Sequence, residues 1–246
     1  MRSFDLINYA IRPNKTVERK IVFAGLAKLS RVFGLSRYRY IGFGAPWFVD
    51  FLMAHKILGM ESMISIESSS LGFQRSTFNC PLACISPMEG LSTHVIPELG
   101  LEQSPATVWF DYDLGIGGPV LADIELLMSK CALNSIVIVT IAAAKDLLPT
   151  KDENEQPIDE EASLRRIAGD LVPTPLPPKR LQPSHYAQLL CQVLTNQFES
   201  AVVNSGRAAK FIKLFEIVYS DSKRMATVGG IVAASEVFKL LVAFVV

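Results

Sequence analysis

Residues 38–47, with the sequence YRYIGFGAPW, decide how this chain folds. The aromatic first half of the stretch predicts a β-strand, and Gly42 and Gly44 predict a turn where that strand ends. Proline is tolerated at the first position of a helix, so Pro46 predicts that a helix follows at once. A strand, a glycine turn and a helix in succession form the first unit of a sheet that is covered by helices.

Similar units follow along the chain. Short apolar runs predict further strands at residues 63–66, 82–85, 107–110 and 135–141. The last of these runs is the most apolar, as expected for a strand covered on both faces. Strands that alternate with helix-like segments indicate parallel βαβ units. The sequence therefore predicts an α/β fold with an open, doubly wound, mostly parallel sheet.

The remaining segments complete this architecture. Residues 15–33 show the spacing of an amphipathic N-terminal helix, and residues 186–203 predict another helix. The apolar segments 211–219 and 225–232 flank a short polar turn and predict a C-terminal antiparallel hairpin. The apolar end, residues 238–246, is too short to span a bilayer, which takes roughly 20 residues, so we expect a helix docked on the core.

One segment interrupts the pattern. Residues 149–183 hold seven prolines and an acidic run, which predicts an irregular insertion or a lid. The whole chain of 246 residues suits one hydrophobic core, so we expect a single Rossmann-like domain over residues 1–246.

Composition narrows the class of protein. Basic and acidic residues balance at 24 each, which gives no reason to expect nucleic acid or a membrane as partner. The four cysteines form no CxxC pair, which favours a cytoplasmic protein with reduced cysteines. We expect no metal site. A homo-oligomer stays open.

Ligands of an open α/β sheet bind outside the carboxyl ends of its strands. Gly42 and Gly44 lie at the first such end, where small residues let the backbone approach a ligand closely; alternatively, they only make a strand-to-helix turn. Trp47 replaces the third glycine of the dinucleotide-binding pattern and opposes NAD. Glu67 ends the next strand, 23 residues after Gly44, where an acid can hold the two hydroxyls of a ribose; the alternative is a solvated charge.

Two acids follow the fourth strand. Asp111 and Asp113 flank a tyrosine and are candidates to contact the amino group of a ligand, a polar group of a substrate, or a divalent cation. They can also be a capping and a surface residue around a packed Tyr112. His185, at the start of a helix, is a further candidate for a general base, although a lone histidine is more often structural.

A polar cluster lies between Arg12 and Lys20, around the start of the first helix. Such a cluster is typical of a solvated helix face. In a functional interpretation, Lys15 or Arg19 binds a ligand carboxylate or an anionic substrate.

The glycine turn, the acid after the second strand and the acid after the fourth strand resemble the class I S-adenosylmethionine-dependent methyltransferases. The final hairpin resembles the antiparallel end of their seven-stranded sheet. The chain is also similar to bacterial proteins catalogued as O-methyltransferases. The resemblance implies S-adenosylmethionine as cofactor and O-methylation of an unidentified acceptor as activity. By this resemblance, the glycine turn of Gly42 and Gly44 lies near the methionine part of the cofactor, and Glu67 binds its ribose. The segment after the third strand, with Met88 and Glu89, borders the adenine. The family's fourth-strand motif corresponds to Asp111 and, less directly, to Asp113.

This sequence also departs from that family. The residues after Gly44 are bulkier than usual, and the Asn-Pro-Pro-Tyr type of motif is absent, which argues against methylation of adenine or cytosine amino groups. Asp111, Asp113 and His185 are the candidates for catalysis of methyl transfer to an alcohol. Two alternatives stay open: a catalytically inactive binding or assembly module with this fold, and an NAD-dependent oxidoreductase.

Overall fold

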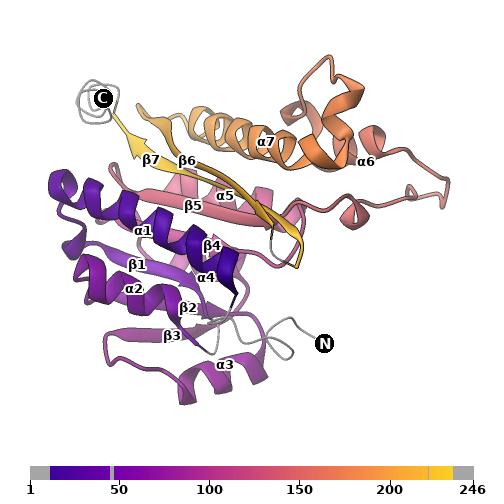
Figure 1. Cartoon of the computed structure of the whole chain (residues 1–246). Helices are drawn as coiled ribbons and strands as arrows, with labels where there is room; N and C mark the ends of the chain where they lie inside the picture. The colour runs from indigo at the N-terminus through magenta and orange to yellow at the C-terminus, as the bar shows by residue number, and fades with distance from the viewer. Residues whose placement is uncertain (1–11, 45–46, 221, 235–246) are drawn as a thin grey trace.

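The computed structural model describes residues 12–44, 47–220 and 222–234. The expected helix start at Pro46 and the apolar end at 238–246 lie outside these residues. Among the described residues, one mixed sheet has seven strands in the order β3-β2-β1-β4-β5-β7-β6 (Figure 1). The strands are β1 (Arg39–Phe43), β2 (Met63–Glu67), β3 (Ile85–Glu89), β4 (Ala106–Asp111), β5 (Ile136–Ala142), β6 (Lys210–Ser220) and β7 (Arg224–Ala233).

The first five strands are parallel, and β7 pairs antiparallel with both β5 and β6. This arrangement confirms the predicted mostly parallel sheet with its C-terminal hairpin. The chain order reverses at β1, which lies between β2 and β4. At such a switch point the loops after neighbouring strands diverge and leave room for a ligand at the carboxyl ends.

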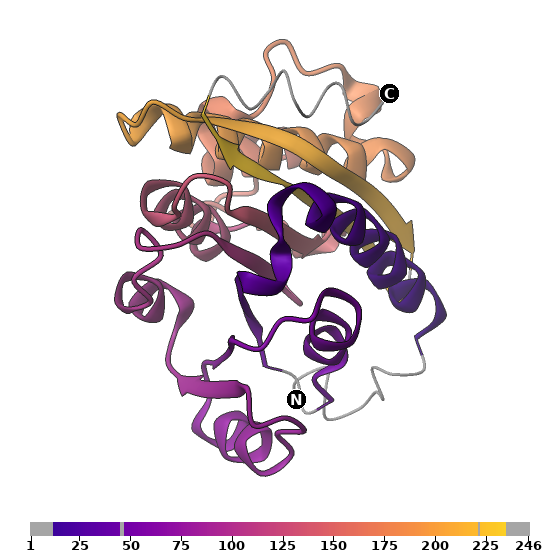
Figure 2. The same cartoon turned by 90° about the vertical axis from the view of Figure 1, so that its left-hand side faces the viewer.

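Helices cover both faces of the sheet (Figures 1 and 2). The helices α1 (Pro13–Phe33) and α2 (Val49–Leu58) pack on one face, where Tyr40 and Trp109 are buried. The helices α5 (Gly118–Lys130) and α7 (Pro183–Asn204) pack on the other face, where Ile41 and Val108 are buried. Successive residues of a strand point to opposite faces, so each central strand contributes to both cores. Shorter helices are α3 (Ser70–Phe78), α4 (Ser92–Val95) and α6 (Glu160–Ala168).

The third strand begins later than the sequence predicts. Leu82 was expected to start it, but the carbonyl of Leu82 accepts a hydrogen bond from the amide of Ile85 in a turn, and β3 runs from Ile85 to Glu89. The strand contains Pro87, which supplies no amide hydrogen. Because β3 is the edge strand, that missing donor costs the sheet little.

The proline-rich insertion is more ordered than expected. It contains the nine-residue helix α6, whose N-cap Asp159 accepts a hydrogen bond from the amide of Ala162. Leu164 and Val172 bury their side chains in the core on the α5 and α7 face. The part before α6 matches an irregular excursion, and the part after it holds two short 3-10 turns, at 169–171 and 178–181, joined by an irregular stretch. Within the described residues, no helix is long and apolar enough to cross a membrane.

Candidate functional site

The glycine turn at the end of β1 lies very close to neighbouring backbone. A methyl group on Gly42 would lie 3.2 Å from the carbonyl oxygen of Trp109 in β4. The amide of Gly44 donates to the carbonyl of Ile66 over 2.9 Å, and a methyl group on Gly44 would lie 2.3 Å from the Oγ of Ser65. Glycine is therefore required at position 44 by the approach of β2, whatever ligand lies above it.

Glu67 at the end of β2 is only 8% exposed, so it is not the solvated strand-end charge of the alternative interpretation. Its Oε1 accepts a hydrogen bond of 3.0 Å from the amide of Ser69, just before α3. A methyl group on Gly72 would lie 2.6 Å from the Glu67 carboxyl carbon, so glycine lets α3 begin directly against this side chain. The first turn of α3 therefore lies directly against the Glu67 carboxylate.

The neighbouring end of β3 brings a second carboxylate to the same edge. Glu89 pairs in register with Glu67 across β2 and β3, and its side chain accepts a hydrogen bond from the hydroxyl of Ser70. Met88 is partly buried beside Ile66, whereas Glu89 is exposed. The structure thus brings Glu67, Met88 and Glu89 together at the carboxyl edge.

Asp111 at the end of β4 lies in a network of buried charges. Its Oδ2 is 2.6 Å from the Nζ of Lys15 in the first turn of α1, and the same ammonium lies 2.9 Å from the Oε2 of Glu18. Lys15 also donates to the hydroxyl of Tyr219 at the end of β6, over 2.9 Å. Burial alone would lower the pKa of Lys15, but the charges of Asp111 and Glu18 outweigh it and hold the pKa above its ordinary 10.5. Lys15 is therefore a cation at neutral pH.

Threonine hydroxyls hold Glu18 in place. Thr140 of β5 donates to the Glu18 Oε1 over 3.2 Å, and Thr227 of β7 donates to the same oxygen. The indole nitrogen of Trp109 donates to Thr140 over 3.1 Å. One helix and three adjacent strands thus fix the position of a single buried carboxylate.

The solvated helix face predicted between Arg12 and Lys20 is wrong for its central residues. Lys15, Glu18 and Arg19 are 3%, 1% and 5% exposed, and only Lys20 among the basic residues after Asn14 faces solvent. The spacing of Lys15 and Glu18, three positions apart, was the available signal that they share one helix face. Their partners on β5 and β7 are distant in sequence, so composition could not identify them.

Another acid, Asp50, lies beneath the glycine turn, on the face of the sheet that α1 and α2 cover. Asp50 in the first turn of α2 accepts a hydrogen bond of 2.9 Å from the hydroxyl of Tyr40, and its Oδ2 lies 3.5 Å from the place of a Gly42 methyl group. Burial raises the pKa of Asp50, and the charge of Arg19 only partly opposes that effect.

The two residues after Asp111 differ in burial. Tyr112 is 8% exposed and donates a hydrogen bond of 2.5 Å to Asp123 in α5, next to the stacked rings of Phe43 and Phe110. Asp113 is exposed. The interpretation of a packed tyrosine therefore holds for Tyr112.

His185 lies in the exposed first turn of α7, where its Nδ1 is 2.8 Å from the Oγ of Ser184. The carbonyl of the preceding Pro183 accepts a hydrogen bond from Arg224, whose own carbonyl accepts from the amide of Ala143, just after β5. This chain of contacts places the start of α7 beyond the carboxyl end of β5. It does not bring His185 into contact with Asp111 or Asp113.

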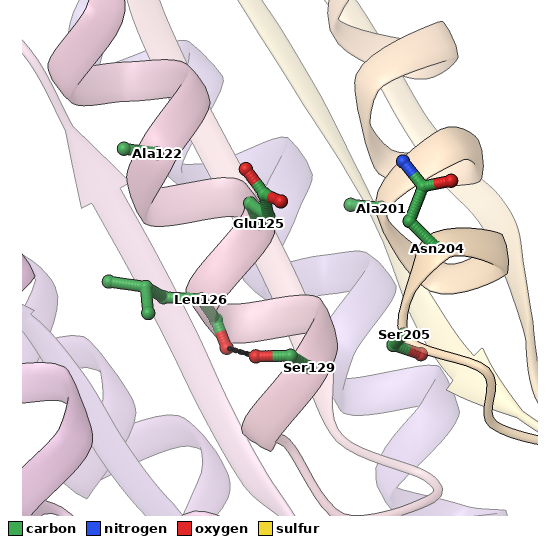
Figure 3. Close-up of a pocket in the computed structure, with 7 residues that line it drawn as sticks. All are labelled: Ala122, Glu125, Leu126, Ser129, Ala201, Asn204 and Ser205. Atoms are coloured by element: carbon green, nitrogen blue, oxygen red, sulfur yellow. Dashed lines mark hydrogen bonds between the residues drawn. The ribbon is translucent and has the colours of Figure 1, made fainter.

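No group of three or more His, Cys, Asp or Glu residues within the described ranges is placed to hold a metal ion. A hollow of about 440 Å³ lies between the outer sides of α5 and α7 (Figure 3). It is lined by Ala122, Glu125, Leu126, Ser129, Ala201, Asn204 and Ser205. Ser129 is near the end of α5, which starts at the carboxyl edge and runs away from it, so this hollow is separate from the strand ends.

The sequence matches the family described as "Putative O-methyltransferase" over residues 7–241, nearly its whole length. The chain belongs to this family. No curated protein sequence matches it. Among solved structures, the complex of Trm1 from Pyrococcus horikoshii with S-adenosyl-L-methionine is similar, with a TM-score of 0.56 and 10% identity over 88% of this chain and 56% of that one. A second similar structure is an O-methyltransferase family member from Klebsiella pneumoniae, with a TM-score of 0.46 and 15% identity over 86% and 81% of the two chains.

The family match and the seven-stranded topology confirm the predicted resemblance to class I methyltransferases and the predicted fold. This chain spans little more than half the length of the Pyrococcus protein. In this member of the O-methyltransferase family, the residues singled out from the sequence fall into two groups. The first group is at the carboxyl ends of β1 to β4 and consists of Gly42, Gly44, Glu67, Met88, Glu89 and Asp111, whereas Asp113 and His185 are exposed residues outside the strands.

Proposed function

We propose that this protein binds S-adenosylmethionine at the carboxyl ends of β1 to β4 and transfers its methyl group to an oxygen atom of an acceptor. The observation that carries the proposal is the nearly buried carboxylate of Glu67, held at the end of β2 beside the glycine turn of β1. A carboxylate only accepts hydrogen bonds, so at the switch point of the sheet it suits a ligand with two adjacent hydroxyls, such as a ribose.

The residues have distinct proposed roles. Gly42 and Gly44 let the end of β1 turn tightly against its neighbours, so that its backbone adjoins the methionine part, and Glu67 accepts hydrogen bonds from the two ribose hydroxyls. Met88 offers an apolar surface next to the adenine ring, with Glu89 at its rim. Asp111 faces the amino-acid end of the cofactor, because β4 adjoins β1 on the side away from β2.

The cofactor supplies an electrophilic methyl group on its sulfonium, so the protein mainly aligns donor and acceptor. An acceptor that is already an oxyanion needs no further help. An alcohol must lose its proton as the carbon–oxygen bond forms, and Asp113 and His185 are the exposed groups proposed as base.

Titration calorimetry of the purified protein with S-adenosylmethionine and S-adenosylhomocysteine tests this proposal. We expect micromolar dissociation constants for both. Absence of heat, together with no thermal shift at millimolar cofactor, would refute it. Fluorescence titration with NADH separates the oxidoreductase alternative, because saturable quenching by NADH alone would favour that class. A protein that binds neither molecule would be a binding or assembly module.

A further inference from the structure

The first turns of α1 place two opposite charges inside the protein, at the carboxyl edge. The side chains of Lys15 and Glu18 are 4% and 0% exposed. A buried ion pair is at best about neutral for stability relative to apolar packing, because both ions lose their hydration. The stability of the α1 face therefore does not explain why charges occupy these two positions.

Lys15 fixes Asp111. Its ammonium group has three donors, and it lies within 2.9 Å of oxygens of Asp111, Glu18 and Tyr219, so its position is fully determined. The Asp111 side chain is 29% exposed, which makes it the member of the charged triad Lys15, Glu18 and Asp111 that a ligand reaches.

Glu18 decides the charge that such a ligand meets. Lys15 and Asp111 alone would form a neutral pair, with little attraction for an ion. Glu18 adds a second negative charge next to Lys15, so the triad carries a net charge of −1. The positive charge of Arg19, one turn beyond Lys15, acts on Lys15, Asp50 and Tyr40 alike, so it does not alter the difference of one charge that Glu18 makes to the triad.

We propose that Glu18 and Lys15 are positioning residues that make Asp111 a receptor for a cationic group, the α-ammonium of the methionine part of the cofactor. This inference rests on the proposed function and deepens it. Lys15 orients the Asp111 carboxylate, and Glu18 cancels the charge of Lys15 so that Asp111 keeps its own. The triad acts on the ammonium through a single exposed carboxylate.

Two ligands separate this effect from cofactor binding in general. S-adenosylhomocysteine carries the α-ammonium, whereas 5′-methylthioadenosine has the same adenosine and thioether but no amino-acid part. We expect Glu18→Gln to weaken binding of S-adenosylhomocysteine by roughly fivefold or more and to leave 5′-methylthioadenosine unchanged. Glu61→Gln is the matched control, because Glu61 is exposed and precedes β2 at the opposite edge.

A second variant keeps the test independent of folding. The double variant Lys15→Met/Glu18→Gln again leaves a net charge of −1, on Asp111 alone, so we expect it to bind S-adenosylhomocysteine more tightly than Glu18→Gln does. Equal losses for both ligands, or a double variant no better than the single one, would overturn the proposal. If the parent protein binds 5′-methylthioadenosine as tightly as S-adenosylhomocysteine, the receptor role fails while the proposed function stands. If it binds neither, both fail.

Discussion

Gly44 lies directly over Ser65, so close that a β-carbon on Gly44 would be 2.3 Å from the hydroxyl oxygen of Ser65. The Ser65 side chain is fully buried, and its Oγ has no hydrogen-bond partner among the residues described. The contact between β1 and β2 at the ligand edge therefore depends on two small side chains at once.

This contact predicts that the effect of a substitution at Gly44 depends on the side chain at position 65. Gly44→Ala should lower the free energy of unfolding by about 1–3 kcal/mol, the usual cost of overpacking a core position. Ser65→Ala alone should be neutral or stabilising, because it removes a buried hydroxyl without a partner. In the double variant the remaining Ser65 Cβ is 3.7 Å from the new methyl group, so most of the stability should return. Urea denaturation of the four proteins measures this coupling.

Gly118→Ala is the matched control, because a methyl group there meets nothing within 4 Å. It should leave stability unchanged or slightly raised. Additive losses in the double variant would show that the backbone of Gly44, and not the Ser65 hydroxyl, sets the cost.

Glu67→Gln should weaken cofactor binding tenfold or more. The carboxylate is proposed to accept bonds from two ribose hydroxyls, and charge-assisted hydrogen bonds contribute about 1.5–3 kcal/mol each at most. Glutamine keeps the shape, but it loses the charge and one accepting atom. Calorimetry on folded samples checks this, with Glu98→Gln as control, because Glu98 is exposed and precedes β4, at the edge opposite the strand ends. Unchanged affinity would remove Glu67 from the site.

The sheet was predictable from sequence because its signals are local. The aromatic run before Gly42 and the apolar run of β5 each lie within a dozen residues, and the two strands of the hairpin follow one another over residues 210–233, so none of them needs a distant partner to be recognised. The position of Glu67 was predictable for the same reason, because Glu67 is the last residue of a strand that can be recognised locally, and the end of that strand lies at the carboxyl edge of the sheet.

The charged triad could not be predicted in this way. Glu18 is 122 residues from Thr140 and 209 from Thr227 in the chain, and it becomes a buried ligand of hydroxyls only after α1 packs across the sheet. Seen alone, a helix start with Lys15 and Glu18 has the composition of a solvated face. The misplaced start of β3 has a similar cause: Leu82 looks like part of a strand until the turn to Ile85 forms.

Limited proteolysis should cut the insertion only before α6. Asp152 accepts hydrogen bonds there from the amides of Asn154 and Gln156, and Glu153 pairs with Arg166 of α6, but that pair lies on the surface and residues 153–157 are all exposed. Beyond it, Arg165 donates to the carbonyls of Val172 and Pro173. A glutamate-specific protease should therefore cleave after Glu153 and Glu155 and spare the helical Glu160 and Glu161, as mass spectrometry of the fragments would reveal. Early cleavage in α6 would contradict the anchoring seen for Arg165.

The stability of the Asp50→Asn variant, relative to that of the parent protein, should increase as the pH rises from about 3 to 7. Burial raises the pKa of Asp50 above its ordinary 3.8, so the folded protein holds the Asp50 proton to higher pH than the unfolded chain does. Ionisation is then easier in the unfolded state, and the parent loses stability as the pH rises from 3.8 to the folded-state pKa. Asparagine cannot ionise, yet its side-chain oxygen still accepts the hydrogen bond from Tyr40.

The difference in unfolding free energy between Asp50→Asn and the parent, measured by urea denaturation at several pH values, should therefore rise across the acid range and level off above the folded-state pKa. Tyr40→Phe separates the hydrogen bond from the charge: it removes the donor but leaves a buried carboxyl, so the stability of this variant should still fall as Asp50 ionises. A difference that falls with pH would mean that Arg19 outweighs burial and that Asp50 is ionised more readily in the folded protein. Asp50 and Arg19 would then form a stabilising pair beneath the glycine turn.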